Sequence, residues 1–137
     1  MDSATVPARR DAFLRLRTFV EEACARAEVR RADEMRVMLL VEELFVNTIE
    51  HGHGQDCDAP IELTLTVTPH AIVVEYADTA RPFDPFAVVE EPRDTADLDE
   101  RAVGGLGIRM ITTMADDVAY ACRDGRNCIS FRVLRSA

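Results

Sequence analysis

The chain has 137 residues, of which 47% are hydrophobic and 30% are charged, a composition typical of one soluble globular domain. Its formal net charge of −9 argues against binding to a nucleic-acid backbone, because proteins that do so present a basic face. The first residues lack the apolar core of a signal peptide, and no apolar run approaches a membrane span. The four cysteines show no CxxC spacing, which favours reduced thiols over structural zinc. We therefore expect a cytoplasmic protein without membrane or nucleic-acid contacts.

Two helices are predicted at the start of the chain. Between residues 9 and 29, apolar residues recur at spacings of three and four, which indicates an amphipathic helix. A second helix is predicted over residues 32–51, with Asp33 as its start signal and Gly52 as its stop. Its apolar residues cover more than one narrow stripe, so we expect it to pack on more than one side.

The second half of the chain is predicted to hold strands and one more helix. The segments 61–67 and 71–77 form a hairpin, and 116–124 with 127–134, separated by Gly-Arg, form another. Residues 86–103 are acidic and weakly periodic, as in a lid or a disordered segment. The sequence GGLGIRMITTMA opens a third helix on glycines.

This order of elements predicts an α+β two-layer sandwich. We expect a mixed, mostly antiparallel sheet of four to five strands, covered on one face by three helices, within a single domain spanning residues 1–137. Only MDSATVPA precedes the first helix, so we expect any N-terminal strand to be a short edge piece.

The stretch EELFVNTIEHGHG (42–54) crowds ionisable groups into a helix that also carries apolar residues. A transition-metal site at Glu50, His51 and His53 is disfavoured, because histidines two apart at a helix end rarely converge on one ion. Glu50 and His53 are expected to face water. Glu43 and Asn47 lie four residues apart on one helical face, where an amide oxygen could bind Mg²⁺ and a carboxylate could accept a proton. A plain surface pair has the same spacing.

Two further motifs carry possible chemistry. Asp78 ends a predicted strand, where it could accept a hydrogen bond from an exocyclic amine or could simply cap the turn. Gly104, Gly105 and Gly107 open a helix, and glycines there let phosphate oxygens approach free backbone amides. A flexible hinge is the alternative reading of these glycines.

The motifs occur in an order that resembles a known family. EELFVNTIEHG resembles the N box of the GHKL ATPases (the Bergerat fold), DTARPFDP resembles their first glycine box, and GGLG resembles the second. The trailing MADDVAYACRDGRNCISFRV is similar to the last two strands of that family. The similarity covers roughly residues 9–134 and is closest to the single-domain anti-sigma-factor serine kinases, the RsbW-type switch proteins of bacterial partner switching.

The resemblance implies specific roles for residues of this chain. Glu43 would be the general base, while its neighbour Glu42 points about 100° away on the helix. Asn47 would bind Mg²⁺, and Asp78 would accept a hydrogen bond from the adenine amine of ATP. Arg101 would reach the terminal phosphate, unless it forms a lid salt bridge instead. The complete set of implied ATP contacts is Asn47, His51, Asp78, Ala80, Phe83, Arg101, Gly104, Gly105 and Gly107.

One position departs from the family pattern. Ala80 occupies a place where the first glycine box usually has glycine, which lets the backbone approach the base. A methyl group there could crowd adenine and weaken ATP binding.

The resemblance also implies partners. These are a sigma factor, held inactive by the kinase, and a small antagonist protein of the STAS type, whose serine accepts the phosphoryl group. A homodimer is possible. Arg15 falls where an arginine of the family contacts partners, although a solvated arginine would fit equally well. The expected function is that of an anti-sigma factor and ATP-dependent protein serine kinase. The alternative is a catalytically weak module of the same fold that acts only by binding proteins.

Overall fold

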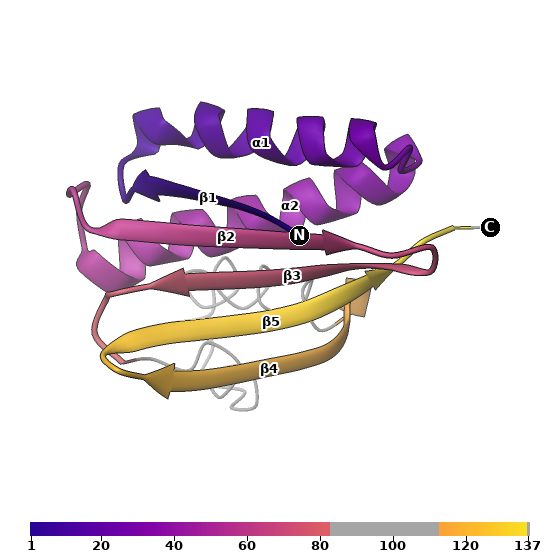
Figure 1. The fold of residues 1–137 in the computed structure, drawn as a ribbon. Coiled ribbons are helices and arrows are strands. Elements are labelled where there is room, and N and C mark those ends of the chain that lie inside the picture. Colours follow the sequence, from indigo (N-terminus) through magenta and orange to yellow (C-terminus); the bar gives the residue numbers. More distant parts are fainter. Residues whose placement is uncertain (83–112, 137) are drawn as a thin grey trace, which may run out of the picture.

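The computed structural model describes residues 1–82 and 113–136. Figure 1 shows one five-stranded sheet in the order β1-β2-β3-β5-β4, with the helices α1 and α2 on one of its faces. The strands are β1 (Asp2–Pro7), β2 (Pro60–Val67), β3 (Ala71–Asp78), β4 (Asp116–Arg123) and β5 (Arg126–Leu134). The helices are α1 (Phe13–Arg26) and α2 (Arg31–Asn47), with short helical segments η1 (Arg10–Ala12) and η2 (Thr48–His53).

The α+β sandwich predicted from the sequence is confirmed. The sheet is not mixed, since all four strand pairings are antiparallel. The predicted lid over 86–103 and most of the predicted third helix lie outside the described residues. Thr113 and Met114, at the end of that helix, are helical.

Both edges of the sheet differ in detail from expectation. The N-terminal strand is not a short piece: β1 pairs with β2 over its full length, from Asp2 opposite Leu65 to Pro7 opposite Pro60. At the other edge, the hairpin turn between β4 and β5 consists of Asp124 and Gly125, one residue earlier than predicted. Their φ angles of 52° and 76° are those of a type I′ turn, whose twist suits antiparallel strands.

The first helix ends earlier than its periodicity suggested. Glu28 adopts a left-handed φ of 54°, and the Val29 amide donates to the Cys24 carbonyl at 2.9 Å. This bond closes the last turn as in a Schellman motif, so α1 stops at Arg26.

The second helix differs from expectation at both ends. Arg30 occupies its N-cap position without a side-chain hydrogen bond, and the predicted cap Asp33 is buried inside the first turn. After Asn47 the chain widens into the π-helical segment η2. It then ends at Gly54, whose φ is +82°, so the predicted stop at Gly52 is wrong.

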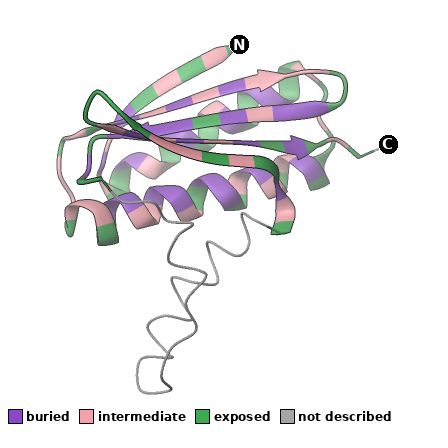
Figure 2. Ribbon diagram, turned by 90° about the horizontal axis from the view of Figure 1, so that it is seen from below, coloured by how far each residue is buried: buried purple, intermediate pink, exposed green. Residues whose placement is uncertain are grey.

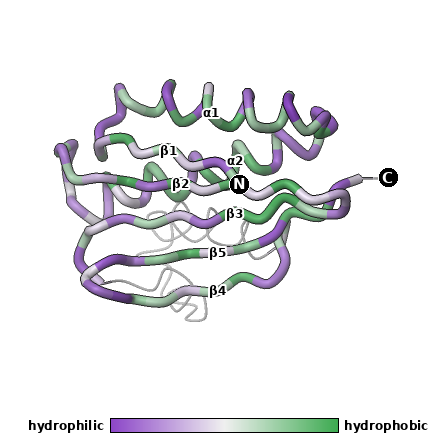
Figure 3. Tube along the Cα trace, in the orientation of Figure 1, coloured by the Kyte–Doolittle hydropathy of each residue, from purple (hydrophilic) through white to green (hydrophobic). Residues whose placement is uncertain are grey.

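The core lies between the sheet and the two helices, where Figure 2 shows the buried residues gathered on the facing sides. Hydropathy alternates along both helices (Figure 3), as expected for elements with one buried side. As predicted, α2 packs on more than one side, because it contacts α1, β3 and β5. From the stretch EELFVNTIEHGHG, this core takes Leu44, Phe45 and Ile49.

Within the described residues, no helix has both the length and the apolar character needed to cross a membrane. The four cysteines all lie in these ranges and are unpaired thiols. Burial, with a further contribution from Glu34, raises the pKa of Cys24 to about 11, so this thiol stays protonated and inert at neutral pH.

The fully buried Asp33 anchors the C-terminal residues to α2. Its carboxylate accepts hydrogen bonds from the Ser136 amide at 2.8 Å and the Ser136 hydroxyl at 2.7 Å, and it pairs with Arg36. Burial acts to raise the pKa of Asp33, but the bonds from Ser136 and Arg36 outweigh it and lower the pKa below 3.8. The ionised carboxylate therefore stabilises the fold.

We expect Asp33→Asn to lower the free energy of unfolding by about 2–3 kcal/mol at pH 7, because a charged acceptor of buried hydrogen bonds is lost. The pKa of Asp33 is depressed in the folded state, so its contribution is present above about pH 4 and is lost as the pH falls through the lowered pKa. Denaturant unfolding at several pH values measures this. A variant that loses as much stability below pH 4 as the natural chain would contradict the assignment.

Candidate functional site

The candidate site lies at the end of the sheet where β3 stops, β5 begins and α2 passes into η2 (Figure 1). The antiparallel register places Asp78, the last residue of β3, opposite Asn127 near the start of β5. Both side chains are buried, with 6% and 4% of their surface exposed. Two polar residues at one strand end are thereby held beside the helix that carries Asn47.

Asp78 is surrounded by hydrogen-bond donors. One carboxylate oxygen accepts from the Asn127 amide at 2.8 Å and from the Ala80 backbone amide at 3.1 Å. The other accepts from the Thr48 hydroxyl at 2.8 Å. Carboxylate oxygens act as hydrogen-bond acceptors, and three donors already surround those of Asp78. A ligand that meets the free side of this group must therefore bring a donor, such as an amine.

A second layer of hydroxyl groups supports Asp78. The Tyr76 hydroxyl lies 2.6 Å from the Thr48 hydroxyl and 3.1 Å from the Leu44 carbonyl oxygen. Complete burial raises the pKa of Tyr76 above its usual range, so this phenol keeps its proton and donates it. The one hydroxyl proton of Tyr76 is directed at the Leu44 carbonyl oxygen and the Thr48 oxygen, so the one proton of Thr48 can be donated to Asp78.

The Asn127 side chain forms hydrogen bonds with the backbone of the turn that follows β3. Its two amide hydrogens are shared among Asp78 and the carbonyl oxygens of Ala80 and Arg81, which both lie 3.1 Å from the amide nitrogen. Its own oxygen accepts a hydrogen bond from the Tyr120 hydroxyl on β4. The turn after β3 is consequently held to β5 by side-chain bonds, which fixes where the backbone of Ala80 lies.

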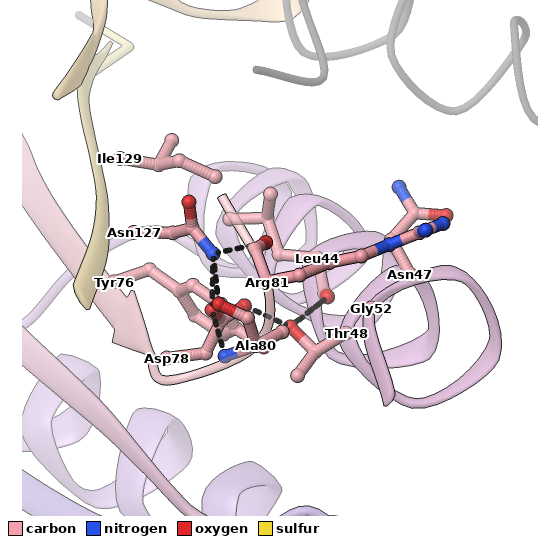
Figure 4. A pocket seen from close by; sticks show the side chains of 10 residues that line it. All are labelled: Leu44, Asn47, Thr48, Gly52, Tyr76, Asp78, Ala80, Arg81, Asn127 and Ile129. Atoms are coloured by element: carbon pink, nitrogen blue, oxygen red, sulfur yellow. Dashed lines mark hydrogen bonds between the residues drawn. The ribbon is translucent and has the colours of Figure 1, made fainter. Parts of the chain in front are cut away.

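These residues enclose a cavity of about 30 Å³ (Figure 4). It has room for ordered water but not for a purine base, because ligand pockets usually span about 300 Å³ or more. A neighbouring recess of about 460 Å³ shares Gly52 and Arg81 with it. The lining residues of the smaller cavity are Leu44, Asn47, Thr48, Gly52, Tyr76, Asp78, Ala80, Arg81, Asn127 and Ile129.

Glu43 and Asn47 lie on one face of α2, since the helix is regular through Asn47. Both are half-buried, and neither side chain forms a hydrogen bond or ion pair within the part of the chain that the structure describes. Burial, together with the charges of Glu42 and Glu50, raises the pKa of Glu43, while His51 acts in the opposite direction. A partly desolvated, unpaired carboxylate has the properties of a general base.

The residues after Asn47 are arranged differently from expectation, because η2 does not continue the four-residue repeat of α2. His51 is exposed and lines the larger recess rather than the cavity with Asn47. Glu50 is exposed as expected and pairs with Arg10 at 3.3 Å. His53 was expected to face water, but it is half-buried, and its Nε2 atom is enclosed with no hydrogen-bond partner among the described residues.

Among residues 1–82 and 113–136, no three His, Cys, Asp or Glu side chains come close enough to hold a metal ion. Magnesium needs fewer protein ligands, because it keeps several waters. The Asn47 amide at the cavity wall provides the type of oxygen that Mg²⁺ prefers.

Of the other predicted site residues, one lines the cavity and the rest lie apart from it or outside the described ranges. Arg15 is exposed on α1. Ala80 lines the cavity. The remaining predicted ATP contacts, Phe83, Arg101, Gly104, Gly105 and Gly107, lie outside the described residues.

The sequence interpretation missed Thr48, Tyr76 and Asn127. One signal for Tyr76 was available, because residues two apart on a strand point to the same face and Tyr76 precedes Asp78 by two. Thr48 and Asn127 become recognisable only when α2, β3 and β5 are brought together.

The site thus places Asn47 of α2 and the buried Asp78 of β3 at the wall of one cavity, on a two-layer α+β sandwich. The chain belongs to the histidine kinase-like ATPase domain family, whose model matches residues 6–133, and the GHKL resemblance is thereby confirmed. Membership of this family implies that the chain binds ATP.

Two known proteins illustrate the relationship. The serine/threonine-protein kinase BtrW of Bordetella bronchiseptica is 29% identical over 89 residues, which make up 65% of this chain and 62% of BtrW. The crystal structure of the SiaB-SiaC complex from Pseudomonas aeruginosa contains a chain similar in fold. Its TM-score is 0.64 at 17% identity, and the match covers 98% of this chain and 88% of that one.

Proposed function

We propose that this protein is an ATP-dependent protein serine kinase of a bacterial partner-switching pathway. It phosphorylates a serine of a small STAS-type antagonist protein and, in its other state, sequesters a sigma factor. The observation that carries the proposal is that Glu43, partly desolvated and bonded to no other described residue, lies on the same helical face as Asn47, which lines the cavity with Asp78. The printed name of BtrW, a serine/threonine-protein kinase, supports the reaction class.

The residues divide the chemistry between them. The serine oxygen of the partner attacks the γ-phosphorus of ATP, the bond to the bridging oxygen breaks and ADP leaves. Glu43 removes the proton from the serine hydroxyl as the new bond forms. Asp78 accepts a hydrogen bond from the adenine amine and so orients the base. Asn47 would provide an oxygen ligand for Mg²⁺, and the ion would supply positive charge beside the phosphates.

The rest of the proposed site is carried over from the resemblance. His51 lies in the larger recess beside the cavity, where it can contact the ribose or the phosphates. Arg101 and the glycines 104, 105 and 107 are proposed to bind the phosphates, and Phe83 to contact the base. Arg15 is proposed to contact a partner from the exposed side of α1. A homodimer in the cytoplasm is the proposed form that holds the sigma factor.

Asn47→Ala provides the test of the nucleotide half of this proposal. We expect Mg-ATP to bind about 10- to 100-fold more weakly, because an oxygen ligand of the metal is lost. Binding measured in EDTA should be the same for the variant and the natural chain. The melting temperature should barely change, because the Asn47 side chain is half-buried and bonds to no other described residue. Equal Mg-ATP affinity in both proteins would contradict the assignment.

A second candidate function is supported by the cavity itself. Its small volume and the buried methyl group of Ala80 favour a module that sequesters its protein partner and transfers phosphate poorly. Incubation with Mg-ATP and a purified antagonist protein separates the two functions. Phosphoserine formation supports the kinase, whereas stable complex formation without any transfer supports the sequestering module.

A further inference from the structure

Gly52 has no backbone reason to be glycine. It lies within η2, and its φ is outside the left-handed region that side chains avoid, in contrast to Gly54 at +82°. The reason is steric: a Cβ atom built on Gly52 would lie 2.8 Å from the Cβ of Ala80. Non-bonded carbon atoms in contact are separated by about 3.5–4.0 Å, so a side chain at position 52 collides with the methyl group of Ala80.

Ala80 is not free to move away from this contact. Its amide donates to Asp78 at 3.1 Å, and its carbonyl oxygen accepts from Asn127 at 3.1 Å. Its side chain is 6% exposed. Both backbone polar groups of Ala80 are therefore hydrogen-bonded, which holds the turn after β3 in place. The methyl group of Ala80 has space only because η2 has no side chain at position 52.

Both residues line the cavity that also contains Asn47 and Asp78 (Figure 4). We infer that Gly52 and Ala80 form a coupled steric pair that sets the width of this cavity, which has room for one methyl group between its two walls. At position 52 the wall formed by η2 carries no side chain, which leaves space for the methyl group of Ala80 in the turn after β3. The part of this inference that concerns nucleotide rests on the proposed function, whereas the steric coupling does not.

The steric coupling is tested by melting temperatures of four proteins without nucleotide: the natural chain, Gly52→Ala, Ala80→Gly and the double variant. We expect Gly52→Ala to lower the melting temperature by roughly 5 °C or more, as overpacking does. In the Ala80→Gly background the same change should cost less than about half as much, because the colliding methyl group is absent. If Gly52→Ala alone does not fold, the double variant should still fold.

Gly54→Ala is the matched control. An added Cβ at Gly54 meets no atom within 4 Å, but the φ of +82° strains any side chain. Its cost arises from the backbone and should be equal in the two backgrounds. If Gly52→Ala lowers the melting temperature equally in both backgrounds, or if the double variant fails to fold, the two residues are not sterically coupled.

The width of the cavity is tested by Mg-ATP titration of the same proteins. Ala80→Gly should bind about tenfold more tightly, since one methyl group at the wall of an apolar pocket changes binding by roughly 10-fold or more. The double variant returns a methyl group to the same space and should bind within about threefold of the natural chain. If Ala80→Gly binds no more tightly, the width assignment is wrong. If none of the proteins binds Mg-ATP, the proposed function fails and the width assignment with it, while the melting temperatures still report the steric coupling.

Discussion

Replacement of Glu43 by Gln is expected to reduce phosphoryl transfer to the partner serine by about 100- to 10,000-fold, the usual contribution of a general base. Mg-ATP binding should be unchanged, because Glu43 does not line the cavity and the substitution keeps its shape. The measurement is a single-turnover assay with purified antagonist protein, alongside a nucleotide titration. Glu42→Gln is the matched control, since Glu42 is exposed next to Glu43 but points away from it on the helix.

The control variant Glu42→Gln is expected to change how the rate of phosphoryl transfer depends on pH. The pKa of Glu43 is raised by burial first and by the charge of Glu42 second. The base must be deprotonated, so activity is lost as the pH falls through this raised pKa. Removal of the negative charge at Glu42 lowers the pKa of Glu43 and should move the acidic limb of the profile to lower pH. Transfer at the normal rate in Glu43→Gln would show that another group removes the proton.

Asp78→Asn is expected to weaken ATP binding by about 100-fold and to shift the preference toward a base with a carbonyl group at the same position. The fold should survive, because an asparagine oxygen can still accept from Ala80 and Asn127. Thr48 can then turn its proton to the Leu44 carbonyl oxygen at 3.0 Å. The new amide, however, presents N–H groups to the ligand, and two donors that face each other in a buried site lose a charge-assisted bond.

Competition between ATP and GTP measures this change in preference. Asp33→Asn is the suitable comparison, because among the described residues Asp33 is also a buried aspartate and it lies at the opposite end of α2. It should lower stability and leave nucleotide affinity unchanged, since independent sites do not couple. If Asp78→Asn retains full ATP affinity, the base is bound elsewhere and the cavity near Asp78 is a packing feature.

Much of the fold was predictable because it follows from local patterns. The alternation over 61–67 and 71–77 predicts β2 and β3 to within one residue, since side chains alternate between the faces of a strand. The boundaries of the helices were less predictable. The left-handed Glu28 and the widening into η2 depend on contacts made after the chain has folded, and neither has a local signature of the kind that glycine or proline provides.

Some residues of the candidate site were likewise predictable from local patterns, whereas others depend on tertiary contacts. Glu43 and Asn47 were recognisable because helical geometry alone relates residues four apart. The same rule failed for His51, since η2 replaces the regular helix one residue after Asn47. The role of Gly52 was also misread: glycine near the end of a helix is usually its stop signal, but this one accommodates the methyl group of Ala80.

By itself, the sequence determined the class of the protein, because the order of Glu43, Asn47 and Asp78 along the chain and the periodicity of the elements between them are one-dimensional properties. Only the tertiary structure decided which groups surround Asp78. Thr48 and Asn127 are 30 and 49 residues away from it in the chain, and the pairing of β3 with β5 and the packing of α2 bring them within hydrogen-bonding distance. The cavity width has the same origin, since it depends on two residues whose contact no local pattern encodes.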